Sequence, residues 1–167
     1  MAPLLILVGV TLLLRLLGFF GLKRLRSWHV SIRGGLAAMF TVTGVSHFGG
    51  LREDFVAMVP PVLPFPELLV TLTGILELLG AAGLLYHRTA PWAAAGLGCL
   101  LVAMFPANVY AAVADITFDD GPAAALLPRS VMQLVFIAAT VFLVLPYIED
   151  FRNRPGEPAM IKLPPTQ

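Results

Sequence analysis

Apolar stretches of close to twenty residues alternate with short polar joints along most of this sequence. An α-helix needs roughly 20 residues to cross a hydrocarbon core about 30 Å thick. Five stretches approach that length, and the second is the shortest. They run from Pro3 to Leu22, about Ile32 to Phe48, Glu67 to Tyr86, Trp92 to Val113, and Arg129 to Tyr147. The pattern predicts an all-α fold, an integral membrane helical bundle with five spans.

The composition agrees with this class and excludes others. Hydrophobic residues make up 58% of the chain and charged residues 13%, whereas soluble domains carry about 25% charged residues. The net charge of +1 provides no basic field, so we expect a lipid bilayer and no nucleic acid as partner. Cys99 is the only cysteine. A single thiol cannot form an internal disulfide, so the chain has no dithiol chemistry of its own.

The basic residues orient the predicted helices. In the first apolar stretch they follow the apolar residues, whereas a signal peptide carries them in front, so we expect a retained helix. Eight basic residues fall on one side of a five-span chain: Lys23, Arg24, Arg26, Arg33, Arg88, Arg152, Arg154 and Lys162. The other side holds Arg52, Arg129, Asp115, Asp119 and Asp120. Because cytoplasmic loops carry an excess of Lys and Arg, we expect the amino terminus outside and the carboxyl terminus inside.

Glu77 lies in the middle of the third stretch, about 15 Å from its outer end. A charged group at that depth costs roughly 2.5 to 3.5 kcal/mol on insertion scales, and such groups mark sites of function. His47, Asn108, Arg129 and Gln133 fall in the outer half of the other helices. Arg129 and Gln133 are four residues apart and share one helix face. These five residues predict an outward-facing polar pocket with Glu77 at its floor.

Each of these residues also has a structural interpretation. Arg15 lies at a similar depth to Glu77, and the two could form a buried ion pair. Asn108 and Gln133 could instead be hydrogen-bond partners between helices. Arg129 could be a snorkelling anchor, and His47 could cap a helix. The sequence leaves these alternatives open.

Two further features bear on the chemistry. His29 and His87 both fall in predicted cytoplasmic joints, so we expect neither a bis-histidine haem nor a metal site. Pro106 lies inside the fourth stretch and should kink that helix, which frees a carbonyl near Val102. A free carbonyl in hydrocarbon needs a hydrogen-bond donor.

Four motifs occur in a fixed order: MVPP-x-LP before the third stretch, G-x-x-E from Gly74 to Glu77, FPAN, and R-x-x-x-Q from Arg129 to Gln133. With these motifs, the region from Gly35 to Tyr147 resembles the DoxX family of small bacterial membrane proteins. Many relatives begin the last helix with an RLPLQ-like sequence, whereas this chain has RSVMQ and lacks the proline.

The resemblance implies a four-helix core at residues 31–148 in the bacterial cytoplasmic (inner) membrane. Residues 1–30 then add a transmembrane helix and a basic cytoplasmic loop, and residues 149–167 form a flexible cytoplasmic tail. DoxX-like proteins are associated with membrane oxidoreductase assemblies. This association implies an accessory or membrane subunit of a redox complex, whose pocket takes a quinone-like or other amphipathic small molecule. Any redox activity then requires a bound quinone or a redox protein partner.

Two other functions remain open from the sequence. The protein could be a small-molecule carrier or exporter with Glu77 as its proton site; five spans without an inverted repeat would then favour a homo-oligomer. It could also be a non-enzymatic assembly or chaperone protein that binds another membrane protein.

Overall fold

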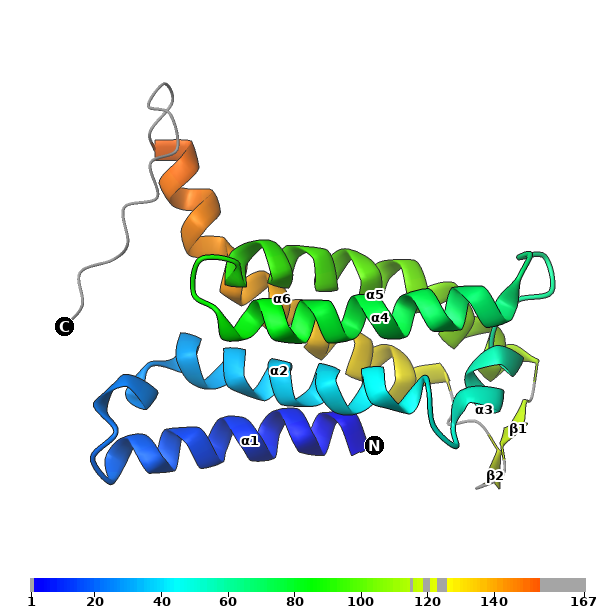
Figure 1. The fold of residues 1–167 in the computed structure, drawn as a ribbon, viewed down its shortest axis with the longest axis horizontal. Helices are drawn as coiled ribbons and strands as arrows, with labels where there is room; N and C mark the ends of the chain where they lie inside the picture. Colours follow the sequence, from blue (N-terminus) through cyan, green and yellow to red (C-terminus); the bar gives the residue numbers. More distant parts are fainter. Residues whose placement is uncertain (1, 115, 119–120, 123–125, 154–167) are drawn as a thin grey trace.

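The computed structural model describes residues 2–114, 116–118, 121–122 and 126–153, which form a bundle of helices (Figure 1). In chain order the elements are α1 (Ala2–Phe19), the 3-10 helix η1 (Lys23–Arg26), α2 (Trp28–Ser46), α3 (Arg52–Ala57), α4 (Pro66–Leu85), α5 (Ala90–Val113), β1 (Thr117–Phe118), β2 (Gly121–Pro122) and α6 (Leu126–Asn153). The five predicted stretches correspond to α1, α2, α4, α5 and α6. Strands β1 and β2 form a short antiparallel pair between α5 and α6.

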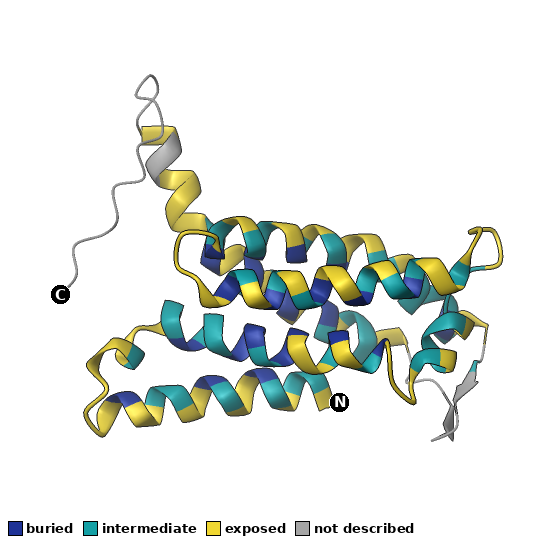
Figure 2. Cartoon of the chain, viewed as in Figure 1, coloured by how far each residue is buried: buried dark blue, intermediate teal, exposed yellow. Residues whose placement is uncertain are grey.

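Helix α2 lies at the centre of the bundle. It packs against α1, α4 and α6, while α5 packs against α4 and α6 (Figure 1). Its side chains Leu36, Ala37, Met39 and Phe40 are at most 3% exposed and form the middle of the core (Figure 2). The outer helices instead expose large apolar side chains, such as Leu79 on α4. This distribution is typical of a bundle whose outer surface contacts lipid.

Among the described residues, four helices are long and apolar enough to cross a membrane: α1, α4, α5 and the Leu126–Glu149 part of α6. The prediction of a helical membrane bundle is confirmed in this form. Helix α2 is less apolar because it carries His29 and Arg33 in its first two turns, together with several Gly, Ser and Thr residues. Its central position explains this composition, since neighbouring helices cover much of its surface.

Helix α6 is longer at both ends than the sequence pattern predicted. It begins at Leu126 and continues through Pro146 to Asn153. Residues 149–153, expected to belong to a flexible tail, are therefore helical. Five charged residues used to predict the orientation lie outside the described residues: Asp115, Asp119, Asp120, Arg154 and Lys162.

The joints between the helices gather at two opposite ends of the bundle (Figure 1). One end holds η1, the turn between α4 and α5, and the last turns of α6. We call it the basic end, defined by Lys23, Arg24, Arg26, Arg33 and Arg88. The other end holds α3 and the β1–β2 pair, and we call it the α3 end.

Candidate functional site

Glu77 is buried at the contact between α4 and α2. Its side chain is 4% exposed, and its Oε2 accepts a hydrogen bond of 2.5 Å from the Thr43 hydroxyl. A Cβ atom added to Gly44 would lie 3.2 Å from the Glu77 Cβ. The missing side chain at Gly44 therefore lets α2 approach the carboxyl-bearing face of α4 closely.

His47 lies one turn after Thr43 and is also buried, at 3% exposure. Its Nδ1 is 2.8 Å from the Thr43 carbonyl oxygen. Because a carbonyl oxygen only accepts, Nδ1 carries the proton, and Nε2 is the acceptor of the neutral ring. The ring packs against Phe55 of α3 with 4.4 Å between ring centroids. Thr43 thus connects both ionisable residues, since its carbonyl binds His47 and its hydroxyl binds Glu77.

Arg52 closes this site at the α3 end. Its Nη1 donates to the His47 carbonyl oxygen at 3.1 Å. Its Nη2 donates to the Thr71 hydroxyl at 3.0 Å and to the Glu67 carbonyl oxygen at 3.3 Å. One guanidinium therefore ties the start of α3 to the end of α2 and the first turns of α4.

The G-x-x-E motif has a physical explanation in this contact. A Cβ added to Gly74 would lie 2.6 Å from the His47 Cβ, closer than real side chains approach. Gly74 and Glu77 are three residues apart and share one face of α4. The glycine allows close contact with α2, and the glutamate places its carboxyl beside Thr43. We call Thr43, His47 and Glu77 the α2–α4 cluster.

Asn108, Arg129 and Gln133 form a second group, which we call the α5–α6 cluster. The Arg129 Nη1 donates to the Asn108 Oδ1 at 3.3 Å, and the Asn108 Nδ2 donates to the Gln133 Oε1 at 3.5 Å. Gln133 is 6% exposed and its Nε2 donates to the Leu101 carbonyl oxygen. That carbonyl lies one residue before Val102, where the Pro106 kink was expected to free one. Gln133 thus supplies a donor one residue before the carbonyl that Pro106 leaves without a helical partner.

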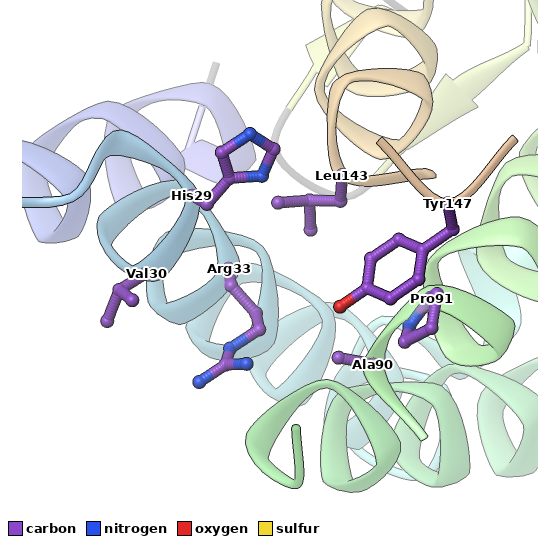
Figure 3. A pocket seen from close by; sticks show the side chains of 7 residues that line it. All are labelled: His29, Val30, Arg33, Ala90, Pro91, Leu143 and Tyr147. Atoms are coloured by element: carbon purple, nitrogen blue, oxygen red, sulfur yellow. The ribbon is translucent and has the colours of Figure 1, made fainter. Parts of the chain in front are cut away.

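The five residues predicted to share one pocket therefore lie in two clusters. Among the described residues, no hydrogen bond joins the α2–α4 cluster to the α5–α6 cluster. A cavity of about 60 Å³ lies instead at the basic end, lined partly by His29, Arg33 and Tyr147. Figure 3 shows the Tyr147 hydroxyl pointing toward the Arg33 side chain, with the His29 ring above Arg33 in this view. None of the five predicted residues lines this cavity.

The alternative ion pair between Arg15 and Glu77 is not formed in the described part of the chain. The Arg15 guanidinium carbon lies 4.2 Å from the centroid of the Trp28 ring and 5.7 Å from that of Phe19. The reason is the order of the helices, because α2 lies between α1 and α4 (Figure 1). The similar depth predicted from the sequence was a poor guide to contact, and α1 ends at Phe19, three residues earlier than predicted.

The prediction missed Thr43, Arg52, Phe55 and Thr71. Thr43 had a recognisable signal, since it lies four residues before His47 and shares its helix face. Arg52 was noted only for its charge. Its three hydrogen bonds depend on how the chain turns between α2 and α3, and the helix periodicity does not specify that turn.

The region that carries both clusters is also the region that matches a known protein family. Residues 36–144, more than half of the chain, match the family described as "Domain of unknown function (DUF8561)". The matched range begins within α2, ends within α6 and leaves out α1. Neither a curated protein nor a solved structure matches the chain. The chain belongs to the DUF8561 family.

Proposed function

We propose that this protein is a DoxX-like protein of the bacterial cytoplasmic membrane that acts as an accessory or membrane subunit of a redox complex. In this proposal the chain crosses the membrane five times, with the amino terminus outside and the basic end in the cytoplasm. The excess of basic residues at that end supports the orientation.

In this proposal, helix α2 also crosses the membrane and brings the number of spans from four to five. Its 19 residues give a length of about 28 Å, close to the hydrocarbon thickness. Its packing against α1, α4 and α6 supports this placement, because those helices are long enough to cross the membrane themselves.

The observation that carries the functional proposal is the incomplete hydrogen bonding of the α2–α4 cluster. Thr43 satisfies only one carboxyl oxygen of Glu77 and only one ring nitrogen of His47. Within the described residues, the Glu77 Oε1 and the His47 Nε2 have no partner, yet neither atom is fully enclosed. We assign these two atoms to the polar head group of a small amphipathic molecule such as a quinone. A quinone carbonyl accepts a hydrogen bond from Glu77 when Oε1 is protonated, and a hydroxyl of the reduced quinol form donates to the His47 Nε2.

The α5–α6 cluster has a different role in this proposal. Its side chains hydrogen-bond one another and the Leu101 carbonyl, so they are engaged within the protein. We assign them to the contact between α5 and α6. Glu77 and His47 then exchange hydrogen bonds or protons with the ligand, while electrons pass between the bound quinone and a redox protein partner, so that one is oxidised as the other is reduced.

A thermal-shift titration with a short-chain quinone tests this proposal on the purified, lipid-reconstituted protein. At a quinone concentration of about 100 times Kd, binding should stabilise the wild-type protein by about 2.7 kcal/mol. Glu77→Gln should abolish this stabilisation. The matched control is Glu67→Gln, which changes an exposed glutamate in the same helix and should leave the shift unchanged. Absence of a shift in the wild type, or an undiminished shift in Glu77→Gln, would refute the proposal.

A non-enzymatic assembly role is the second candidate. It is favoured by the α5–α6 cluster, because the side chains of that cluster hydrogen-bond one another and need no ligand as a partner. Affinity purification from native membranes distinguishes the two functions. A stoichiometric membrane partner that binds wild type and Glu77→Gln equally, with no quinone shift in either, would favour assembly.

A further inference from the structure

An apolar groove runs along the surface between α1, α2 and α6. Its volume is about 260 Å³, and it is lined by Leu7, Val8, Thr11 and Leu12 of α1, Trp28 and Ile32 of α2, and Ala139 of α6. Val8, Leu12 and Trp28 are 46%, 55% and 51% exposed, so the groove opens on the outside of the bundle. In a membrane this surface contacts lipid.

Arg15 lies where the groove reaches the basic end. It stacks on Trp28, which also lines the groove, so the charged position and the apolar groove are contiguous. Arg15 is four residues before the end of α1 at Phe19, which places it about 6 Å from the helix end. This is a depth at which an arginine reaches the head-group region by snorkelling.

A second cation lies beside the first. Arg15 and Arg26 both contact the Phe19 ring, with guanidinium carbons 5.7 Å and 5.6 Å from its centroid. The two charges are therefore within about 11 Å of each other, roughly one Debye length in 0.1 M salt. In the described part of the chain, neither forms an ion pair with a carboxylate. An anion beside both guanidinium groups would lower their mutual repulsion.

We propose that this surface binds one anionic glycerophospholipid. Its phosphate lies beside Arg15 and Arg26, Trp28 covers the glycerol region, and one acyl chain occupies the groove along α1. Basic pockets beside transmembrane helices on the cytoplasmic side bind such head groups. Charge complementarity favours an anionic lipid over a second copy of this chain, because an apolar helix would fill the groove and leave both cations unpaired.

Native mass spectrometry tests the site with the full chain reconstituted in nanodiscs of equal phosphatidylglycerol and phosphatidylcholine with identical acyl chains. Wild-type protein released from the nanodiscs should keep one bound phosphatidylglycerol. The phosphatidylglycerol-bound species should be about tenfold more abundant than the phosphatidylcholine-bound species, because each basic residue adds to the attraction of anionic lipid. The double variant Arg15→Gln/Arg26→Gln should lose this preference. The matched control Lys23→Gln/Arg24→Gln removes the same charge from η1 and should keep it.

A second variant tests the groove. Val8→Trp places a large ring at an exposed position of the groove, so it should fold and should lower retention of both lipids several-fold. Equal retention of the two lipids by wild type, or equal loss in both double variants, would overturn the proposal. So would a two-chain species without lipid. Glu77→Gln should retain the lipid, which separates this site from the proposed quinone function.

Discussion

The contacts α2–α4 and α5–α6 both bury polar side chains between two long helices, but for different reasons. At α5–α6, Gln133 donates to a backbone carbonyl in the stretch of α5 that contains Pro106. At α2–α4, Gly44 and Gly74 already allow the helices to pack closely, and Glu77 is not needed to satisfy any backbone group. The comparison teaches that a buried polar side chain binds the backbone of the neighbouring helix in one contact, whereas in the other Thr43 binds the Glu77 carboxyl and leaves its Oε1 without a partner among the described residues.

The largest expected effect comes from separating α2 from α4. Gly74→Ala would place a methyl group 2.6 Å from the His47 Cβ, and such overpacking destabilises by about 1 to 3 kcal/mol. Unfolding in mixed micelles, followed by tryptophan fluorescence, measures this loss. Gly96→Ala is the control, because nothing lies within 4 Å of an added Cβ there. Equal stability of the two variants would contradict close packing at Gly74.

Loss of the Gln133 side-chain donor should have the next largest effect. Gln133→Leu removes the hydrogen bond to the Leu101 carbonyl and should cost about 1 to 2 kcal/mol in the same unfolding measurement. Asn108→Leu should cost less, because its hydrogen bonds are 3.3 Å and 3.5 Å long and it is only partly buried. If Asn108→Leu were the more damaging change, the role assigned to Gln133 would be wrong.

Thr43→Val should have the smallest effect on stability. It is nevertheless the most informative test of how the α2–α4 contact differs from the α5–α6 contact. It removes the hydroxyl donor to Glu77 with little change of shape, so we expect a loss of about 0.5 to 1.5 kcal/mol. The quinone-dependent thermal shift should nevertheless disappear, since Glu77 would lose its fixed orientation. Thr43→Ser keeps the hydroxyl and should keep the shift. A normal shift in Thr43→Val would show that Thr43 does not position Glu77.

The lengths of the apolar stretches were sufficient to locate the five long helices. They were insufficient for α3, for the ends of α6 and for the order of the helices in space. Length and apolarity located α1, α4, α5 and α6, because crossing a membrane imposes a minimum length. They did not indicate that α2 lies between α1 and α4, and the ion pair of Arg15 with Glu77, which the sequence left open, is not formed. Which faces meet is decided by small residues such as Gly35, Gly44 and Gly74, whose contacts are visible only after packing.

The candidate site was predictable to a similar extent. Glu77 and His47 were identified because ionisable residues are rare at their positions in apolar stretches. The spacing of Arg129 and Gln133 correctly placed them on one helix, but depth alone joined them to Glu77 in a single pocket. The hydrogen bonds within each cluster involve groups that have no unusual sequence signal. Examples are the Thr43 hydroxyl, which binds Glu77, and the Leu101 carbonyl, which binds Gln133.

The modest apolarity of α2 has a consequence for biogenesis. A helix that carries His29 and Arg33 in its first two turns partitions poorly from the translocon into lipid on its own, because an arginine is costly there. Its preceding neighbour α1 is strongly apolar and packs directly on it through Gly35. In the five-span topology, α1 and α2 would therefore enter the bilayer together as a helical hairpin. Although α1 lies outside the matched family region, it would act as an insertion partner for the helix at the centre of the bundle.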